Sequence, residues 1–254
     1  MSKLDVLVLQ HIACEPPGVY EDVLVERGAS IERIELDEGE PLPEQRDFGA
    51  VIAMGGPMSV NEEDNHPWLA AEKSFVAELV RSGTPFWGVC LGVQLLASSL
   101  GARVYQGAAP EVGLLPVELT PEGREDPVFA PLPDGLVTLQ WHGDTFELPQ
   151  GAVRLAGSHA YENQAFRYNA AYGVQFHLEV TPSMAREWAA VPAYAASLDE
   201  TLGPGSAPGF LTRIEYGAAE MLGHGRSLFE RWLDRVVSPE PARTRPRPVR
   251  RSGR

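Results

Sequence analysis

The sequence has few cysteines and a shortage of positive charge. Cys14 and Cys90 are the only cysteines in 254 residues, so a disulfide framework is not expected and a reducing cytoplasm fits. Lys and Arg number 21 against 35 Asp and Glu, which gives a net charge of −14. This excess of negative charge disfavours nonspecific binding to nucleic acid or to an anionic membrane. We therefore expect neither as a partner.

Long apolar runs and common cofactor motifs are also missing from the sequence. No run approaches the roughly 18 apolar residues that cross a bilayer, and the first residues resemble no signal peptide. No His-Glu-x-x-His or paired Cys-x-x-Cys spacing occurs, and no Gly-x-x-x-x-Gly-Lys-Ser/Thr phosphate loop. We expect no metal and no required cofactor. The acidic run 61–66 fits a capping loop before the helix that Pro67 begins better than it fits a metal site.

Charge and proline are unevenly distributed along the chain. Residues 238–254 hold six arginines, four prolines and one glutamate, which leaves a net charge of −19 on residues 1–237. Such a composition predicts a disordered tail over 238–254. The tail could fold back on the acidic body, bind a partner or have no function. We expect one domain over 1–237, including C-terminal helices from about residue 182.

Apolar and turn-forming segments alternate as in an α/β protein. This alternation predicts a mainly parallel central sheet with helices on both faces. Residues 103–180 predict antiparallel additions, and 182–236 predict helices broken around 203–205 and at Gly223. Strands are expected at 4–10, 31–36, 48–54 and 85–89, and helices at 16–27, 67–81 and 91–100.

Cys90 lies at the centre of the segment Gly88-Val-Cys-Leu-Gly92, between an apolar strand and a helix. This arrangement is typical of a nucleophile elbow, with sulfur in place of the usual serine oxygen. The glycines are needed because side chains there would clash with the adjoining strand and helix. The helix N-terminus favours the thiolate, which is the reactive form. Alone, the motif is equally compatible with a buried core cysteine.

His177 and Glu179 end another apolar segment, 171–180. On a strand, positions i and i+2 share a face, so the two side chains should lie together and Leu178 should point away. A carboxylate beside an imidazole fixes its tautomer and supports its protonated form. With Cys90, these residues complete the set of groups that activates a cysteine nucleophile.

Together these motifs resemble those of the class I, triad-type glutamine amidotransferases. The matching segments are 54–59 (Met-Gly-Gly-Pro-Met-Ser), 88–94 and 175–179, and the resemblance covers about residues 4–180. It is nearest to stand-alone proteins similar to the amidotransferase domain of GMP synthase. The resemblance implies a flavodoxin-like amidotransferase fold. The family usually has proline where this chain has Leu178, and we expect little effect on the chemistry because that side chain should face away.

The resemblance also implies roles for individual residues. Cys90, His177 and Glu179 would form the catalytic triad, with the amides of Gly56 and Leu91 as the oxyanion hole. Further residues would bind substrate; these are Gly55, Gln94, Trp141, His142 and Gly143. His177 is preferred over His142 as the base because it has a paired acid.

The implied activity is hydrolysis of the side-chain amide of glutamine, or of a related γ-glutamyl amide, through a cysteine thioester. Released ammonia would pass to an unknown acceptor, such as a separate synthase subunit. Other functions stay open at this point: a stand-alone γ-glutamyl peptide or amide hydrolase, a related cysteine peptidase, or a non-catalytic regulatory module. The intact triad argues against the last of these.

Overall fold

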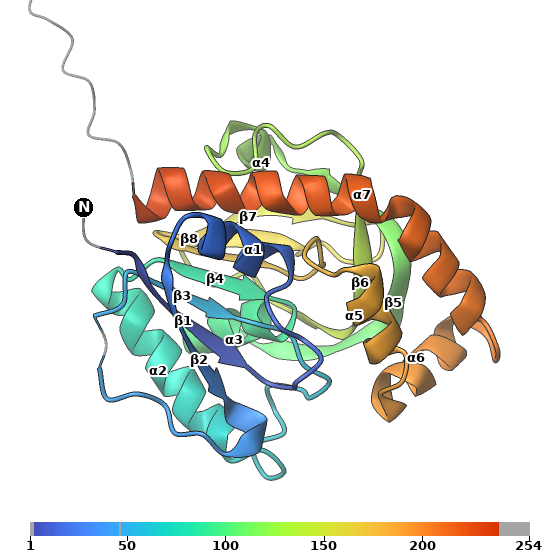
Figure 1. Cartoon of the computed structure of the whole chain (residues 1–254), viewed down its shortest axis with the longest axis horizontal. Coiled ribbons are helices and arrows are strands. Elements are labelled where there is room, and N and C mark those ends of the chain that lie inside the picture. Colours follow the sequence, from blue (N-terminus) through green and yellow to red (C-terminus); the bar gives the residue numbers. More distant parts are fainter. Residues whose placement is uncertain (1–2, 46, 239–254) are drawn as a thin grey trace, which may run out of the picture.

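A nine-stranded mixed sheet forms the centre of the molecule in the computed structural model, which describes residues 3–45 and 47–238 (Figure 1). The strand order is β2-β1-β3-β4-β9-β8-β7-β5-β6. The strands are β1 (Asp5–Gln10), β2 (Ser30–Glu35), β3 (Ala50–Ala53), β4 (Phe86–Val89), β5 (Val104–Leu119), β6 (Leu136–Phe146), β7 (Val153–Gly157), β8 (Ala165–Tyr168) and β9 (Ala171–Val174).

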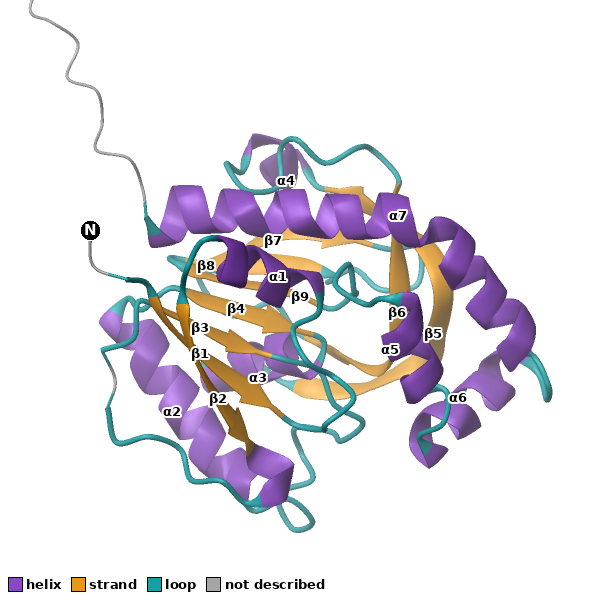
Figure 2. Ribbon diagram, viewed as in Figure 1, coloured by secondary structure: helices purple, strands orange, loops and turns teal. Residues whose placement is uncertain are grey.

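Helices cover both faces of this sheet (Figure 2). The helices are α1 (Val19–Glu26), α2 (Trp68–Ser82), α3 (Leu91–Ser99), α4 (Pro121–Glu125), α5 (Pro182–Trp188), α6 (Pro192–Leu202) and α7 (Ala207–Trp232), with short 3-10 and π turns at η1 (Leu36–Glu38) and η2 (Leu233–Val237). The predicted α/β fold, with a large sheet flanked by helices, is confirmed.

The parallel half of the sheet comprises β2, β1, β3, β4 and β9. Successive side chains of a strand point to opposite faces, and both faces of β1 are buried. Val6 and Val8 belong to the apolar cluster that includes α1 and α7, whereas Leu7 and Leu9 belong to the cluster that includes α2 and α3. Burial on both faces explains why these strands read as unbroken apolar runs.

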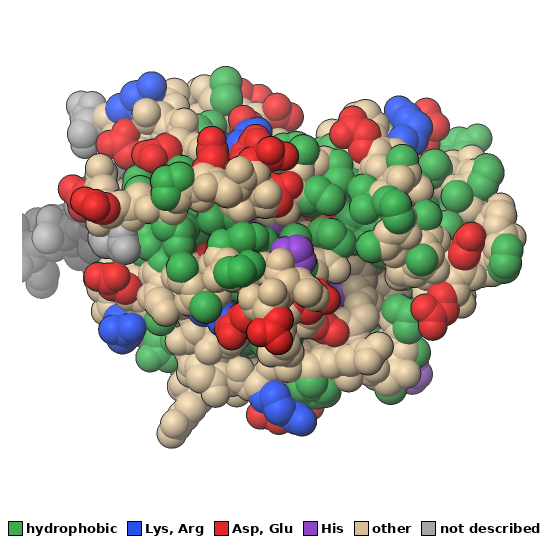
Figure 3. Space-filling view, turned by 90° about the horizontal axis from the view of Figure 1, so that it is seen from below, with side chains coloured by type: hydrophobic (Ala, Val, Ile, Leu, Met, Phe, Trp, Pro, Cys, Tyr) green, Lys and Arg blue, Asp and Glu red, His purple; other side chains and the backbone are tan. Residues whose placement is uncertain are grey.

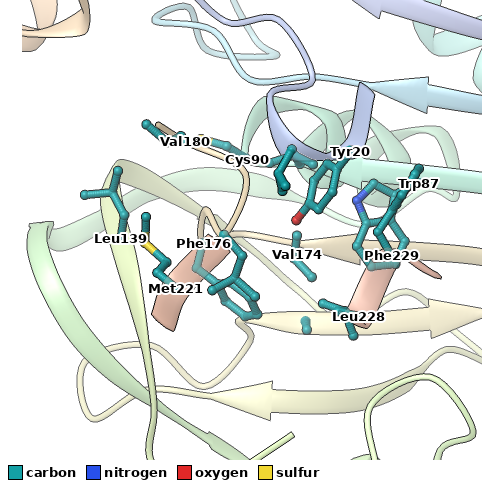
Figure 4. Close-up of a cluster of buried hydrophobic side chains, with 14 of the residues drawn as sticks. Tyr20, Trp87, Cys90, Leu139, Val174, Phe176, Val180, Met221, Leu228 and Phe229 are labelled. Carbon is teal, nitrogen blue, oxygen red and sulfur yellow. The ribbon is translucent and has the colours of Figure 1, made fainter. Parts of the chain in front are cut away.

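The antiparallel additions lie where the sequence predicts them. β8 pairs with β9 and β7, and the long strand β5 pairs with both β7 and β6. Figure 4 shows part of the first core cluster, in which Tyr20, Trp87 and Phe229 pack together and which also contains Cys90. Cys90 is therefore part of this hydrophobic core cluster.

Two predicted boundaries are wrong. Gly223 does not break the last helix, because α7 runs from Ala207 to Trp232. One exposed glycine costs a helix about 1 kcal/mol, less than α7 gains by burying its apolar face. The sequence predicts that the segment 171–180 is a strand that ends in His177–Glu179, but the last parallel strand ends at Val174, and His177 forms an isolated bridge with Leu139.

The predicted break at 203–205 does separate α6 from α7. Of the predicted tail 238–254, Ser238 alone falls within the described residues, so that prediction lies outside them. No helix in the described ranges is both long and apolar enough to span a bilayer.

Candidate active site

Cys90 occupies a sharp turn between β4 and α3, at the N-cap of the helix. Its backbone has φ 52° and ψ −105°, and its N–H donates to Val174 O on β9 at 2.8 Å. Besides Asn169, it is the one non-glycine residue with positive φ in the described part of the chain. Unfavourable backbone angles persist only where the surroundings impose them. This geometry is that of a nucleophile elbow, and it directs the thiol out of the strand–helix junction.

The two flanking glycines are required by close packing. A Cβ on Gly88 would lie 2.6 Å from Gly92 O, and one on Gly92 would overlap Ala53 O on β3. Both distances are too short for a side chain. The spacing of glycines around Cys90 therefore reflects how tightly α3 approaches β3 and β4 at the elbow.

His177 and Glu179 lie together beside Cys90. His177 Nδ1 is 2.7 Å from Glu179 Oε1, and the other carboxylate oxygen accepts the Leu178 N–H at 3.0 Å. Trp188 packs against the His177 ring in a T-shaped arrangement, with 4.8 Å between the ring centroids. Both side chains are almost completely buried. The imidazole is thus fixed in orientation and leaves Nε2 free for the sulfur.

The environment of His177 stabilises its charged form. Burial alone would lower the pKa of this imidazole, but the negative charge of Glu179 and a hydrogen bond with Cys90 outweigh burial, so the pKa is raised well above its ordinary value. A histidine that holds a proton next to a thiol can form the thiolate–imidazolium pair on which cysteine nucleophiles depend.

The glycine pair after β3 lies next to His177 and Cys90. A Cβ built on Gly55 would approach His177 Cε1 at 3.4 Å, and one on Gly56 would lie 3.1 Å from the Leu91 side chain. Within the described residues, the Gly56 N–H meets no acceptor on the protein. The structure therefore brings Gly55, Gly56 and Leu91 together beside Cys90, as the sequence predicts.

A pocket of about 300 Å³ opens onto Cys90. Gln94, one helical turn after the cysteine, lines it and donates to Gln175 Oε1 at 3.1 Å; Gln175 Nε2 in turn lies 3.5 Å from Cys90 Sγ. The remaining lining residues come from the loop after β3, from β6 and from α6. They are Gly56, Pro57, Met58, Ser59, Glu62, Trp141, His142, Gly143, Asp144, Ala193, Tyr194 and Ser197.

His142 lies in the same pocket but is held by other groups. Its Nδ1 is 2.9 Å from Asp144 O, and its Nε2 is 3.2 Å from Glu111 Oε2. Both ring nitrogens are therefore occupied away from Cys90. The geometry supports the preference for His177 as the base and leaves His142 as part of the pocket wall.

The pocket wall is acidic. Glu62 and Asp144 line it, and no Lys or Arg is among the described residues around it. Asp144 accepts from the Ser59 hydroxyl at 2.6 Å, which ties the loop after β3 to β6. Figure 3 shows acidic side chains spread over one face of the molecule with few basic ones between them. The site therefore disfavours highly anionic ligands.

Sequence reasoning missed two groups of buried residues near His177 and Gly55. Glu15 is 1% exposed and accepts a hydrogen bond from Tyr194 of α6. Burial raises the pKa of Glu15 to about 7 although His177 opposes this shift. His11 and Glu72 form a second buried pair. Neither group has a recognisable spacing, because each joins residues far apart in the chain.

Comparison with known proteins identifies the family of this chain. Residues 19–188 match the family model "Glutamine amidotransferase class-I", and the chain belongs to this family. It is 34% identical over 176 residues to the glutamine amidotransferase-like protein YfeJ of Salmonella typhimurium, covering 67% of this chain and 74% of that protein. It is 32% identical over 168 residues to a glutamine-hydrolyzing GMP synthase subunit of Sulfurisphaera tokodaii, covering 64% and 85%.

The fold is shared with solved structures. A glutamine amidotransferase from Thermotoga maritima superimposes with a TM-score of 0.82 at 35% identity, over 92% of this chain and 100% of that one. A glutamine amidotransferase from Methylobacillus flagellatus gives 0.80 at 28% identity, over 91% and 95%. The family supports, in general terms, hydrolysis of the glutamine amide with transfer of ammonia.

Proposed function

We propose that this chain hydrolyses the side-chain amide of glutamine, or of a related γ-glutamyl amide, with Cys90 as nucleophile. The observation that carries this proposal is the juxtaposition of Cys90 at a strained elbow with a buried His177 held 2.7 Å from Glu179. The pocket above the sulfur has room for a small amino-acid amide.

The reaction has two halves. Cys90 Sγ attacks the amide carbon, a sulfur–carbon bond forms, and the carbonyl oxygen becomes an oxyanion facing the amides of Gly56 and Leu91. As the intermediate collapses, the carbon–nitrogen bond breaks and His177 gives its proton to the departing ammonia. Water then loses a proton to His177 and attacks the thioester, which releases glutamate and returns the proton to sulfur.

Ammonia release from L-glutamine by the purified chain tests this proposal. We expect release that is lost in Cys90→Ala and kept in Cys14→Ala, which changes the other cysteine of the chain. Cys14 is partly exposed and forms no part of the pocket. Release at the wild-type rate by Cys90→Ala would disprove the role of this cysteine.

The acceptor of the ammonia is a second part of the proposal. We infer that a separate synthase receives it, which the likeness to the glutamine-hydrolyzing GMP synthase subunit of Sulfurisphaera tokodaii supports. Co-purification from the source cell tests this: a synthase that binds the chain and raises its glutaminase rate supports the inference. Absence of such a partner, with full activity of the chain alone, would contradict it.

One observation favours hydrolysis of a larger γ-glutamyl amide as the second candidate. Ala193, Tyr194 and Ser197 of α6 form one wall of the pocket, yet α6 lies outside the residues that match the family model. A pocket wall outside the matched segment is a means of selecting a substrate. Comparing kcat/KM for glutamine, γ-glutamyl methylamide and γ-glutamyl dipeptides distinguishes the two candidates.

A further inference from the structure

His11 is completely buried at the end of β1, between the loop after β3 and the first turns of α2. Its Nδ1 is 3.2 Å from Gly55 O and its Nε2 is 2.9 Å from Glu72 Oε1. Trp68, one turn before Glu72 on α2, stacks on the imidazole at 5.5 Å with the planes 18° apart. These contacts fix both the position and the orientation of the His11 ring.

Both nitrogens of His11 face oxygen atoms. A carbonyl oxygen accepts hydrogen bonds only, so Nδ1 must carry a hydrogen to bond Gly55. Burial alone would lower the pKa of His11, but the charges of Glu72 and Glu15 and the hydrogen bonds to Glu72 and Gly55 raise it above its ordinary value. The imidazole is thereby kept in the form that donates to both oxygens.

The Gly55 carbonyl and the Gly56 N–H belong to the same peptide group. The described chain has no cis peptide bond, so in this planar trans unit the C=O and the N–H point in opposite directions. Fixing the carbonyl on His11 therefore fixes where the Gly56 N–H points. Two adjoining glycines have wide conformational freedom and do not hold a peptide orientation on their own.

We propose that His11, held by Glu72, is a positioning residue that keeps the Gly55–Gly56 peptide turned with its N–H toward the oxyanion. A donor to the carbonyl also polarises the peptide and strengthens its N–H as a hydrogen-bond donor. The inference rests on the proposed function, because it assumes that Gly56 stabilises an oxyanion formed at Cys90.

Two double variants test this role and differ only in the donor at position 11. Removing His11 alone would leave Glu72 buried without a partner, so both variants carry Glu72→Leu. In H11L/E72L no donor faces Gly55 O, whereas in H11N/E72L the Asn amide takes the place of the Nδ1–H. His224→Leu, on the surface of α7, controls for the loss of a histidine.

For H11L/E72L we expect kcat for glutamine to fall about 10²-fold, as on loss of one oxyanion donor, with KM within about threefold of wild type. H11N/E72L should recover most of this loss. Alkylation of Cys90 by iodoacetamide forms no oxyanion, so its rate should stay unchanged in both. The inference would be overturned if kcat in H11L/E72L equalled that of wild type, or if the two double variants lost kcat equally. A fall in the rate of Cys90 alkylation that matched the fall in kcat would also overturn it.

A structural measurement separates this inference from the proposed function. The crystal structure of H11L/E72L should show the Gly55–Gly56 peptide turned or in two orientations, whichever amide is the substrate. An unchanged peptide would refute the positioning role. Absence of any amide hydrolysis by the wild-type chain would instead refute the proposed function.

Discussion

At the scale of single residues, the site depends on a buried carboxylate, Glu179, that is paired with the imidazole of His177. Glu179 holds His177 by one carboxylate oxygen and its own loop by the other. A buried carboxylate used in this way orients the imidazole and supports its positive charge, as the acid of a catalytic triad does. The same residue therefore holds both its own loop and the imidazole of His177 in place.

Glu179→Gln should lower kcat by about 10²-fold or more, because the amide no longer supports the imidazolium form of His177. The rate of Cys90 alkylation at pH 7 should fall in parallel. Steady-state assays and iodoacetamide kinetics measure the two effects. Glu122→Gln, on an exposed glutamate of α4, should change neither, and normal turnover by Glu179→Gln would remove this residue from the triad.

At the scale of elements, α6 and α7 are positioned by contacts with Glu15 and with the segment from His177 to Glu179. Tyr194 of α6 donates to Glu15, which lies beside His177 and Glu179. Gly225 of α7 approaches the backbone of Leu178, between His177 and Glu179, so closely that a Cβ there would overlap Leu178 O. The C-terminal helices thus help to determine the geometry of the site.

Tyr194→Phe should raise KM several-fold with a smaller effect on kcat, because α6 forms a wall of the pocket and loses its bond to Glu15. Loss of a buried hydrogen bond should also cost about 1 kcal/mol of unfolding free energy. Tyr216→Phe is the matched control, since Tyr216 is 88% exposed on α7. An unchanged KM in Tyr194→Phe would show that α6 does not depend on this contact.

Gly225→Ala and Gly223→Ala should have opposite effects although they lie two residues apart on α7. The first forces a methyl group into Leu178 O and should destabilise the protein by about 1–3 kcal/mol, with reduced activity. The second meets nothing within 4 Å and should stabilise the helix by about 0.5–1 kcal/mol. Chemical denaturation measures both, and equal effects would contradict the packing described for α7.

At the scale of the whole molecule, buried titratable groups near the site make stability depend on pH. The folded-state pKa of Glu15 is raised from 4.5 to about 7, so its carboxyl group favours folding less as pH rises from 4.5 to 7. The folded-state pKa values of His11 and His177 are raised above 6.5, so their stabilising contribution is present below pH 6.5 and is lost as pH rises further. Through these three groups, stability should therefore fall as pH rises from about 4.5 through neutral pH.

Glu15→Gln should remove part of this pH dependence. At pH 8 the variant avoids a buried carboxylate and should gain up to about 3 kcal/mol of unfolding free energy, with little change at pH 4.5. Denaturation at several pH values measures this difference. The exposed Glu118→Gln variant should follow wild type, and a Glu15→Gln variant that is no more stable at pH 8 would contradict the raised pKa.

Much of this protein follows from local sequence. Strands buried on both faces must be apolar throughout, helices begin and end at recognisable residues, and an elbow needs glycines on both sides of Cys90; these requirements are visible in short segments. The pairing of the His177 and Glu179 side chains is also visible in the sequence, although the strand ends before them. Side chains two residues apart are close enough to meet.

Other features were decided by tertiary structure alone. His11 and Glu72 are 61 residues apart and Glu15 and Tyr194 are 179 apart, so no local pattern joins them. The continuity of α7 through Gly223 depends on what its opposite face buries, which the glycine itself does not show. The sequence by itself determined the fold class and pointed to Cys90 and His177 as the proposed nucleophile and base, because these features depend on neighbouring residues. Packing decided what holds these residues in place, because burial brings distant residues into contact.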